Sequence, residues 1–171
     1  MNKNIAASIL CALASLVLLS ACAGNGTEGE AMSELNGGEY TAESRIDDVM
    51  TDPAFGDYGR LLFPVEREYM SGDTLGSLGL TWYSYIDPDE TVEIVNTLRE
   101  RAAAGDTVFY DIYTVDEKAA DPDKADTGLF FFRGDEGAPF AVCSAGGAFA
   151  YVGAMQASFP PAPGLGIRGY S

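Results

Sequence analysis

The longest apolar run of the chain lies at its N-terminus. Residues from Ile5 to Leu19 are almost wholly apolar and follow Lys3, a pattern typical of the charged and hydrophobic regions of a secretory signal. The run is shorter than the roughly 20 residues that a membrane-spanning helix needs. We therefore predict a signal peptide over residues 1–21 and a folded part that begins after it.

The signal ends in a sequence that resembles the bacterial lipoprotein box. Leu19-Ser20-Ala21-Cys22 places a cysteine directly after small residues, and in such a box the cysteine carries lipid and becomes the first residue of the mature chain. The resemblance predicts an exported protein anchored to the membrane of the cell envelope through Cys22. Cleavage by the ordinary signal peptidase, with Cys22 incidental, is the alternative.

The segment after the predicted anchor has no apolar periodicity. Residues 22–51 are mostly small, polar and acidic, a composition that favours a flexible tether.

Residues 52–106 combine an aromatic and glycine-rich stretch with one helix. The stretch 52–85 follows neither a helical nor a strand period, so we expect an irregular packed extension. A helix is predicted from Asp87, an N-cap residue followed by Pro88 at the first helical position, and Gly105 ends it. The apolar positions of this helix recur at helical spacing, at Val92, Val95, Leu98 and Ala102. We expect the charged residues between them to face solvent, at Glu93, Arg99, Glu100 and Arg101.

Three short apolar runs predict strands in the remaining part of the chain. They cover residues 107–113, 129–133 and 139–144 and are rich in β-branched and aromatic side chains. The turn sequence of residues 134–137 is short, which predicts that the second and third strands form an antiparallel hairpin.

Charge and composition restrict the function. The chain holds 26 Asp and Glu against 10 Lys and Arg, a net charge of -16, and so acidic a surface repels the phosphate backbone of nucleic acids. A hydrophobic fraction of 47% predicts a packed core. The sequence contains no histidine, which excludes a complete Ser-His-Asp or Cys-His site within it.

Five segments together resemble the front part of a group of bacterial α/β-hydrolases. They are DPAFGDYGRLLFP, TWYSYIDPDETVEIVN, FYDIYT, DTGLFFFRG and PFAVCSAGGAFAYVGAM, between about Asp52 and Phe159. These hydrolases are serine esterase-like or lipase-like enzymes, often compared with acetyl-xylan esterases. The resemblance implies an α/β fold, in which residues 107–171 supply the first strands and the glycine loop of an incomplete hydrolase sheet.

The resemblance also assigns a role to the glycine loop. It places Gly146, Gly147 and Ala148 in a loop whose backbone N–H groups contribute to the oxyanion hole. The family usually has a third glycine where this chain has Ala148. After Phe159 the family continues with a helix, which the prolines and glycines of residues 160–166 oppose here.

The resemblance covers no catalytic triad. The sequence contains no G-x-S-x-G nucleophile elbow and stops at Ser171, before the family's acidic partner and histidine. We expect the N-terminal portion of an exported, lipid-anchored ester hydrolase that is inactive by itself, without cofactor or metal, and able to self-associate through an open sheet edge. The alternative is a non-catalytic surface lipoprotein that acts as a binding or structural module.

Three further groups of residues suggest chemistry but have simpler explanations. Cys143 and Ser144 resemble a nucleophile pair, yet no histidine activates them, so we favour packing at a strand end. Asp121, Asp123 and Asp126 suggest a calcium loop, and we favour a solvated acidic connector. Three aromatic side chains precede the helix, at Trp82, Tyr83 and Tyr85. They suggest stacking on sugar rings, and we favour packing, which is the commoner role of such side chains.

Overall fold

The computed structural model describes residues 38–167. The chain divides into two units, Met1–Glu30 and Ala31–Ser171, and all described residues belong to the second. The predicted signal peptide, the predicted lipidation site Cys22 and the start of the predicted tether lie outside the described residues.

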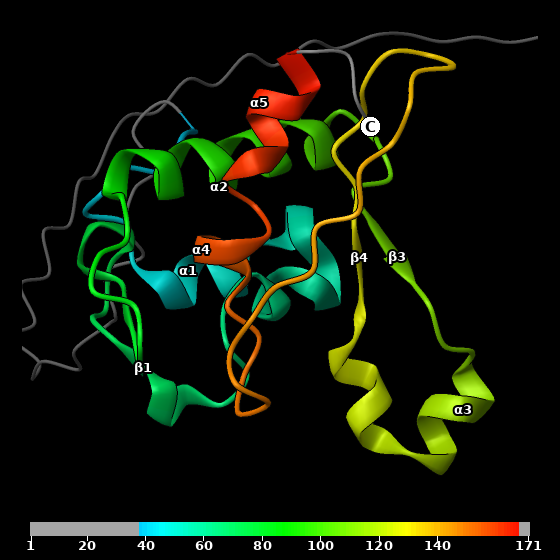
Figure 1. The fold of residues 1–171 in the computed structure, drawn as a ribbon, viewed down its shortest axis with the longest axis horizontal. Helices are drawn as coiled ribbons and strands as arrows, with labels where there is room; N and C mark the ends of the chain where they lie inside the picture. Colours follow the sequence, from blue (N-terminus) through cyan, green and yellow to red (C-terminus); the bar gives the residue numbers. More distant parts are fainter. Residues whose placement is uncertain (1–37, 168–171) are drawn as a thin grey trace, which may run out of the picture. The chain divides into compact units, whose positions relative to one another are not determined.

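Helices and short strands alternate along the described part of the chain (Figure 1). In order, the elements are α1 (Ile46–Met50), η1 (Pro53–Leu62), η2 (Arg67–Tyr69), β1 (Met70–Ser71), η3 (Leu75–Ser77), β2 (Gly79–Leu80), α2 (Pro88–Ala103), β3 (Phe109–Asp111), α3 (Val115–Ala120), η4 (Pro122–Asp126), β4 (Gly128–Phe130), α4 (Ala154–Ala157) and α5 (Pro161–Ile167). This mixture agrees with the expected α/β class in general terms. Both sheets of the described residues are two-stranded and antiparallel, β1 with β2 and β3 with β4.

Helix α2 confirms the helix predicted from the sequence. The side chain of Asp87 accepts hydrogen bonds from the backbone N–H groups of Asp89 and Glu90, at 2.9 and 3.2 Å. Pro88 occupies the first helical position, and Gly105 follows the helix with a φ of +89°. Cap, proline and terminal glycine therefore act as the sequence indicates.

The hydrophobic core extends into the segment that was predicted to be a tether. Tyr40, Ile46 and Val49 are buried in the core, and Ile46 and Val49 lie three residues apart in α1, on one face of that helix. The prediction of a flexible tether up to residue 51 is therefore wrong for the described residues 38–51. A few apolar side chains spaced among acidic ones suffice to pack this segment.

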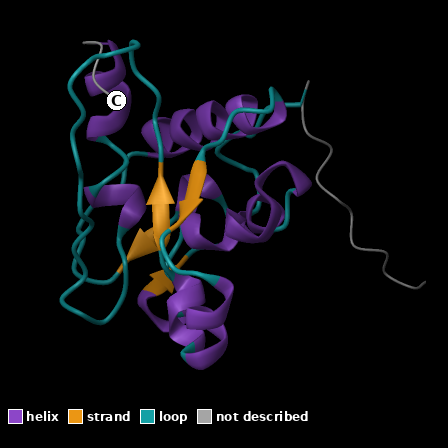
Figure 2. Cartoon of the chain, turned by 90° about the vertical axis from the view of Figure 1, so that its right-hand side faces the viewer, coloured by secondary structure: helices purple, strands orange, loops and turns teal. Residues whose placement is uncertain are grey.

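The strands pair differently from the predicted hairpin. β3 lies within the predicted strand 107–113, and β4 overlaps the first residues of the predicted strand 129–133. The two pair with each other in the register Phe109↔Phe130. The predicted third strand, 139–144, lies instead in the long segment without helix or strand between β4 and α4, which Figure 1 places by its labels; such segments are teal in Figure 2. The hairpin prediction is therefore wrong.

Aromatic packing explains the observed pairing. The ring of Phe109 lies over Gly128, where a Cβ atom would be 2.0 Å from the ring. Tyr58 stacks on Phe109, with the ring centroids 5.0 Å apart, and Phe130 meets Phe109 edge to face at 5.1 Å. Pairing β3 with β4 thus joins three aromatic rings in one cluster.

The proline-rich end of the described chain is helical, contrary to expectation. Helix α5 starts at Pro161 and includes Pro163 in its first turn. Backbone N–H groups of a first turn have no partner within the helix, so proline loses no hydrogen bond there. A proline opposes a helix at interior positions, and the prolines here lie in the first turn instead.

Candidate functional site

An apolar cavity of about 570 Å³ lies beside β4. Aromatic side chains from four parts of the chain line it, including Phe63, Phe109, Phe130, Phe132 and Phe159. Phe159 packs against the rings of Phe130 and Phe132, with centroid distances of 5.1 and 5.8 Å. The wall is therefore made by interlocked rings rather than by isolated side chains.

The segment Phe140–Ala145, which we call the wall segment, also lines the cavity. It has no helix or strand, and its main-chain groups form no hydrogen bond with other described residues. Phe140 and Val142 are 76% and 71% exposed although they also line the cavity. The wall segment thus presents apolar side chains to solvent and lacks the backbone pairing that would hold a strand in place.

The polar lining of the cavity is sparse. Glu66 and Asp126 are the charged residues among the lining, and both are acidic. Asp126 forms an ion pair with Arg60, whose guanidinium also donates to the carbonyl of Ala125 at 3.0 Å. The remaining polar side chains are hydroxyls and one thiol, from Thr127, Cys143, Ser144 and Ser158.

Cys143 and Ser144 lie in the wall segment and line the cavity. Both are exposed, and Cys143 is a free thiol, so the expectation that they pack at a strand end is wrong. Neither side chain forms a hydrogen bond with another described residue. The structure places the pair at a cavity but gives it no activating base.

The predicted oxyanion loop follows the wall segment and does not line the cavity. The carbonyls of Gly146 and Gly147 accept hydrogen bonds within the loop, from the N–H groups of Gly153 and Ala150, both at 2.9 Å. A Cβ atom on Gly147 would be 1.9 Å from the carbonyl oxygen of Tyr151, so only glycine fits there. Ala148 has a φ of +53°, in the left-handed region where the family's third glycine would be unstrained. The oxyanion role stays a prediction.

The aromatic residues before α2 lie away from this cavity. Trp82 is 64% exposed and stacks on Tyr151, with the centroids 5.7 Å apart and the planes 14° from parallel. Tyr69 completes this cluster, while Tyr85 is exposed. Packing accounts for one side of Trp82, and Tyr83 packs against the core, in line with the interpretation favoured from the sequence. Tyr85, which is 72% exposed, does not follow that interpretation.

The acidic connector forms ion pairs instead of a metal site. Asp121 pairs with Lys124 at 3.8 Å, and Asp126 pairs with Arg60. Within residues 38–167 no group of three or more acidic, cysteine or histidine side chains is arranged to hold a metal ion.

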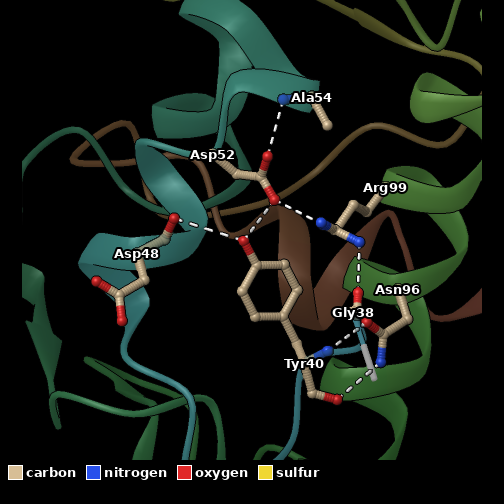
Figure 3. Close-up of polar contacts among 7 residues, drawn as sticks. All are labelled: Gly38, Tyr40, Asp48, Asp52, Ala54, Asn96 and Arg99. Carbon is tan, nitrogen blue, oxygen red and sulfur yellow. Dashed lines mark hydrogen bonds and ion pairs between the residues drawn. The ribbon is translucent and has the colours of Figure 1, made fainter. Parts of the chain in front are cut away.

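A buried polar network joins the start of the described chain to α2 (Figure 3). Asp52 accepts hydrogen bonds from the Tyr40 hydroxyl at 2.7 Å, from Arg99 Nε at 2.6 Å and from the backbone N–H of Ala54 at 2.8 Å. Arg99 also donates to the carbonyl of Gly38. The side chain of Arg99 is 26% exposed, so its assignment to the solvent side of the helix is wrong.

Asn96 adds a second link between the same two segments. Its side chain accepts from the backbone N–H of Tyr40 at 2.8 Å and donates to the carbonyl of Tyr40 at 2.9 Å, as an added strand would (Figure 3). These bonds satisfy main-chain groups of a segment that belongs to no sheet. The network therefore has a structural role, and none of its side chains lines the cavity beside β4.

The network shifts the ionisation of its members. Burial tends to raise the pKa of Asp52, but the hydrogen bonds from Tyr40, Ala54 and Arg99 outweigh burial, and the pKa of Asp52 is lowered. Burial, together with the Asp52 carboxylate, raises the pKa of Tyr40 well above its ordinary value. The hydrogen bond to Asp52 raises the pKa of Arg99. At neutral pH the network therefore contains a carboxylate, a guanidinium and a neutral phenol.

The comparisons with known proteins give no assignment, because no family model, curated protein or solved structure matches the chain. The resemblance to α/β-hydrolases thus rests on its sequence segments alone. None of the helices among the described residues has the length and apolar character to cross a membrane.

The cavity was not predicted from the sequence, although the distribution of charged residues contained a signal for it. Residues 137–167 contain no Asp, Glu, Lys or Arg, in a chain with a net charge of -16. This uncharged stretch contributes the wall segment, Val152, Ala154 and Phe159 to the cavity. A long uncharged segment in an acidic chain was therefore the sequence feature that marked part of the lining.

Proposed function

We propose that this chain is a non-catalytic binding protein of the cell envelope that takes an apolar ligand into the cavity beside β4. The observation that supports the proposal is the cavity itself, about 570 Å³ with a mostly aromatic and aliphatic lining. Binding pockets for small ligands measure roughly 300 to 1,000 Å³ and combine an apolar lining with few polar groups.

The wall segment gives the cavity a means of admitting a ligand. Its main chain is not hydrogen-bonded to other described residues, so moving it breaks no backbone pairing. A ligand would also cover the exposed side chains of Phe140 and Val142. Each methylene group that the cavity removes from water stabilises the complex by about 0.8 kcal/mol.

Export and anchoring form a separate part of the proposal. They rest on the apolar N-terminal run and on Leu19-Ser20-Ala21-Cys22. In a bacterial host, wild-type protein should carry a fatty-acyl mass and fractionate with membranes, and Cys22→Ala should lose both properties. An unmodified, soluble wild-type protein would refute the anchor without affecting the cavity.

Ester hydrolysis is the second candidate, favoured by the position of Ser144 and Cys143 on the cavity wall next to the glycine loop. In that case the cavity would hold the acyl part of the ester. The sequence has no histidine, so we expect no turnover of an activated short-chain ester by this chain alone. Saturable hydrolysis that Ser144→Ala abolishes would favour the hydrolase over the binding protein.

Fluorescence titration with Nile red, a neutral apolar dye, tests the binding proposal. We expect detergent-free full-length protein to bind the dye saturably. Ala141→Trp fills the cavity from an exposed position of the wall segment and should weaken binding at least tenfold, or about 1.4 kcal/mol. The control Ala120→Trp lies in α3, away from the cavity lining, and should bind normally. Absence of saturable binding, or equal weakening in both variants, would contradict the proposal.

A further inference from the structure

The charges around the cavity restrict the ligand that it can hold. Glu66 and Asp126 are the ionisable carboxylates on the lining, and no lysine or arginine lines it. The whole chain adds a net charge of -16. A ligand that carries its own negative charge would meet repulsion at the cavity and on approach to it.

Arg60 contacts the lining residue Asp126, and Arg133 follows the lining residue Phe132 in the sequence. Arg60 is paired with Asp126 and bonded to the carbonyl of Ala125. Arg133 lies over the ring of Phe131, with its guanidinium carbon 5.5 Å from the ring centroid. At Arg60 an anionic head group would have to displace the Asp126 carboxylate. The guanidinium of Arg133 keeps its N–H groups while it stacks on the ring, but Arg133 is not among the lining residues, so an anionic group inside the cavity does not meet it there.

The mouth of the cavity is apolar as well as its interior. Phe140, Val142 and Val152 line the cavity and remain more than half exposed. A compact ring buried in the interior would leave these side chains in water, whereas a long chain would cover them. The lining thus favours an extended apolar ligand over a small one.

We infer that the ligand is an uncharged compound with a long hydrocarbon chain, such as a fatty ester or fatty alcohol, and that the cavity discriminates against the fatty-acid anion of equal chain length. This inference rests on the proposed binding function. Burying a carboxylate in an apolar wall without a partner loses its hydration, whereas an ester or hydroxyl group needs only one hydrogen bond. Thr127, Ser144 and Ser158 offer hydroxyl groups on the lining for that bond.

The test is displacement of bound Nile red by three probes of equal chain length: lauryl alcohol, methyl laurate and laurate. At neutral pH and low salt, we expect both neutral probes to displace the dye at concentrations at least tenfold lower than laurate. Added salt should narrow this difference, because it screens the repulsion.

Matched variants identify the source of the discrimination. Glu66→Gln removes a carboxylate from the lining and should strengthen the binding of laurate severalfold relative to that of lauryl alcohol. Glu68→Gln removes a carboxylate that is absent from the lining and should leave both probes unchanged. Equal effects of the two variants would show that the net charge of the protein, and not the carboxylate on the lining, weakens laurate binding. That result would overturn the inference that the lining causes the discrimination.

The outcomes separate the inference from the proposed function. Laurate that displaces the dye as well as lauryl alcohol would overturn the inference while the binding function stands. If that binding is lost in Arg133→Gln, the cation beside Phe131 is the anion partner, and the inference is equally wrong. If no probe binds saturably, the proposed function itself fails.

Discussion

A single carboxylate, Asp52, connects three parts of the described chain. It accepts bonds from Tyr40, from the start of η1 and from α2. Its side chain is 8% exposed, so solvent cannot replace a lost partner there. The Asp47–Arg67 pair, by contrast, lies on the surface with Asp47 61% exposed.

We predict different costs for neutralising these two carboxylates. Asp52→Asn leaves Arg99 beside a neutral amide and should lower the free energy of unfolding by about 2 to 3 kcal/mol, the value of buried bonds to a charged group. Asp47→Asn should change it by less than about 0.5 kcal/mol. Urea unfolding followed by circular dichroism measures both, and equal costs would contradict the structural role of the network.

The same residue predicts a pH dependence. The pKa of Asp52 is lower in the folded state than in the unfolded state. The ionised carboxylate therefore contributes to the free energy of unfolding above the ordinary aspartate pKa of about 3.9, and this contribution is lost as pH falls through the lowered pKa. Wild type should therefore lose more stability than Asp52→Asn between about pH 5 and pH 3. Parallel stability curves for the two proteins over that interval would show that Asp52 does not have a lowered pKa.

Ala148 offers a test of backbone strain in the glycine loop. Ala148 has a left-handed φ of +53°. For a residue with a Cβ atom, this conformation lowers the stability of the folded state by about 1 kcal/mol or more. Ala148→Gly should therefore stabilise the protein slightly, by up to about 1 kcal/mol after the entropic cost of glycine. Ala119→Gly, in the exposed α3 helix, should have the opposite sign and cost about 0.5 to 1 kcal/mol. Thermal unfolding compares the two, and destabilisation by both would argue against the strained turn.

At the scale of elements, the sequence predicted those features that depend on interactions between residues close together in the chain. Asp87, Pro88 and Gly105 define α2 because caps act within one turn of chain. The pairing of β3 with β4 depends on a contact between Phe109 and Gly128, and no local pattern contains it. Tyr40 is likewise held by Asn96, 56 positions away, and Arg99 by Asp52, 47 positions away. Local patterns therefore misassigned the tether and the solvent side of α2.

Hydrogen exchange distinguishes the observed pairing from the predicted hairpin. Amides in the β3–β4 pairing should be protected, because the two strands share backbone hydrogen bonds. Amides of the wall segment should exchange at nearly unprotected rates, because its main chain lacks such bonds. Protection across residues 140–144 would instead support the hairpin of 129–133 with 139–144.

At the scale of the molecule, the acidic and the uncharged parts of the chain differ in role. The acidic part contains the Asp52 network and α2, whereas the uncharged stretch 137–167 contributes much of the cavity lining. Composition could reveal that stretch but not the cavity, since the rest of the lining includes distant residues such as Phe63 and Phe109. The position of the site depends on tertiary packing and was beyond sequence reasoning.

The most direct test of the proposed function is a map of amide chemical shifts during titration of isotope-labelled full-length protein with lauryl alcohol. The account predicts saturable shifts at Phe130–Phe132 and along the wall segment, with α3 unaffected. No saturable shift, or shifts centred on Trp82 and Tyr85 instead of the cavity lining, would contradict a binding site beside β4.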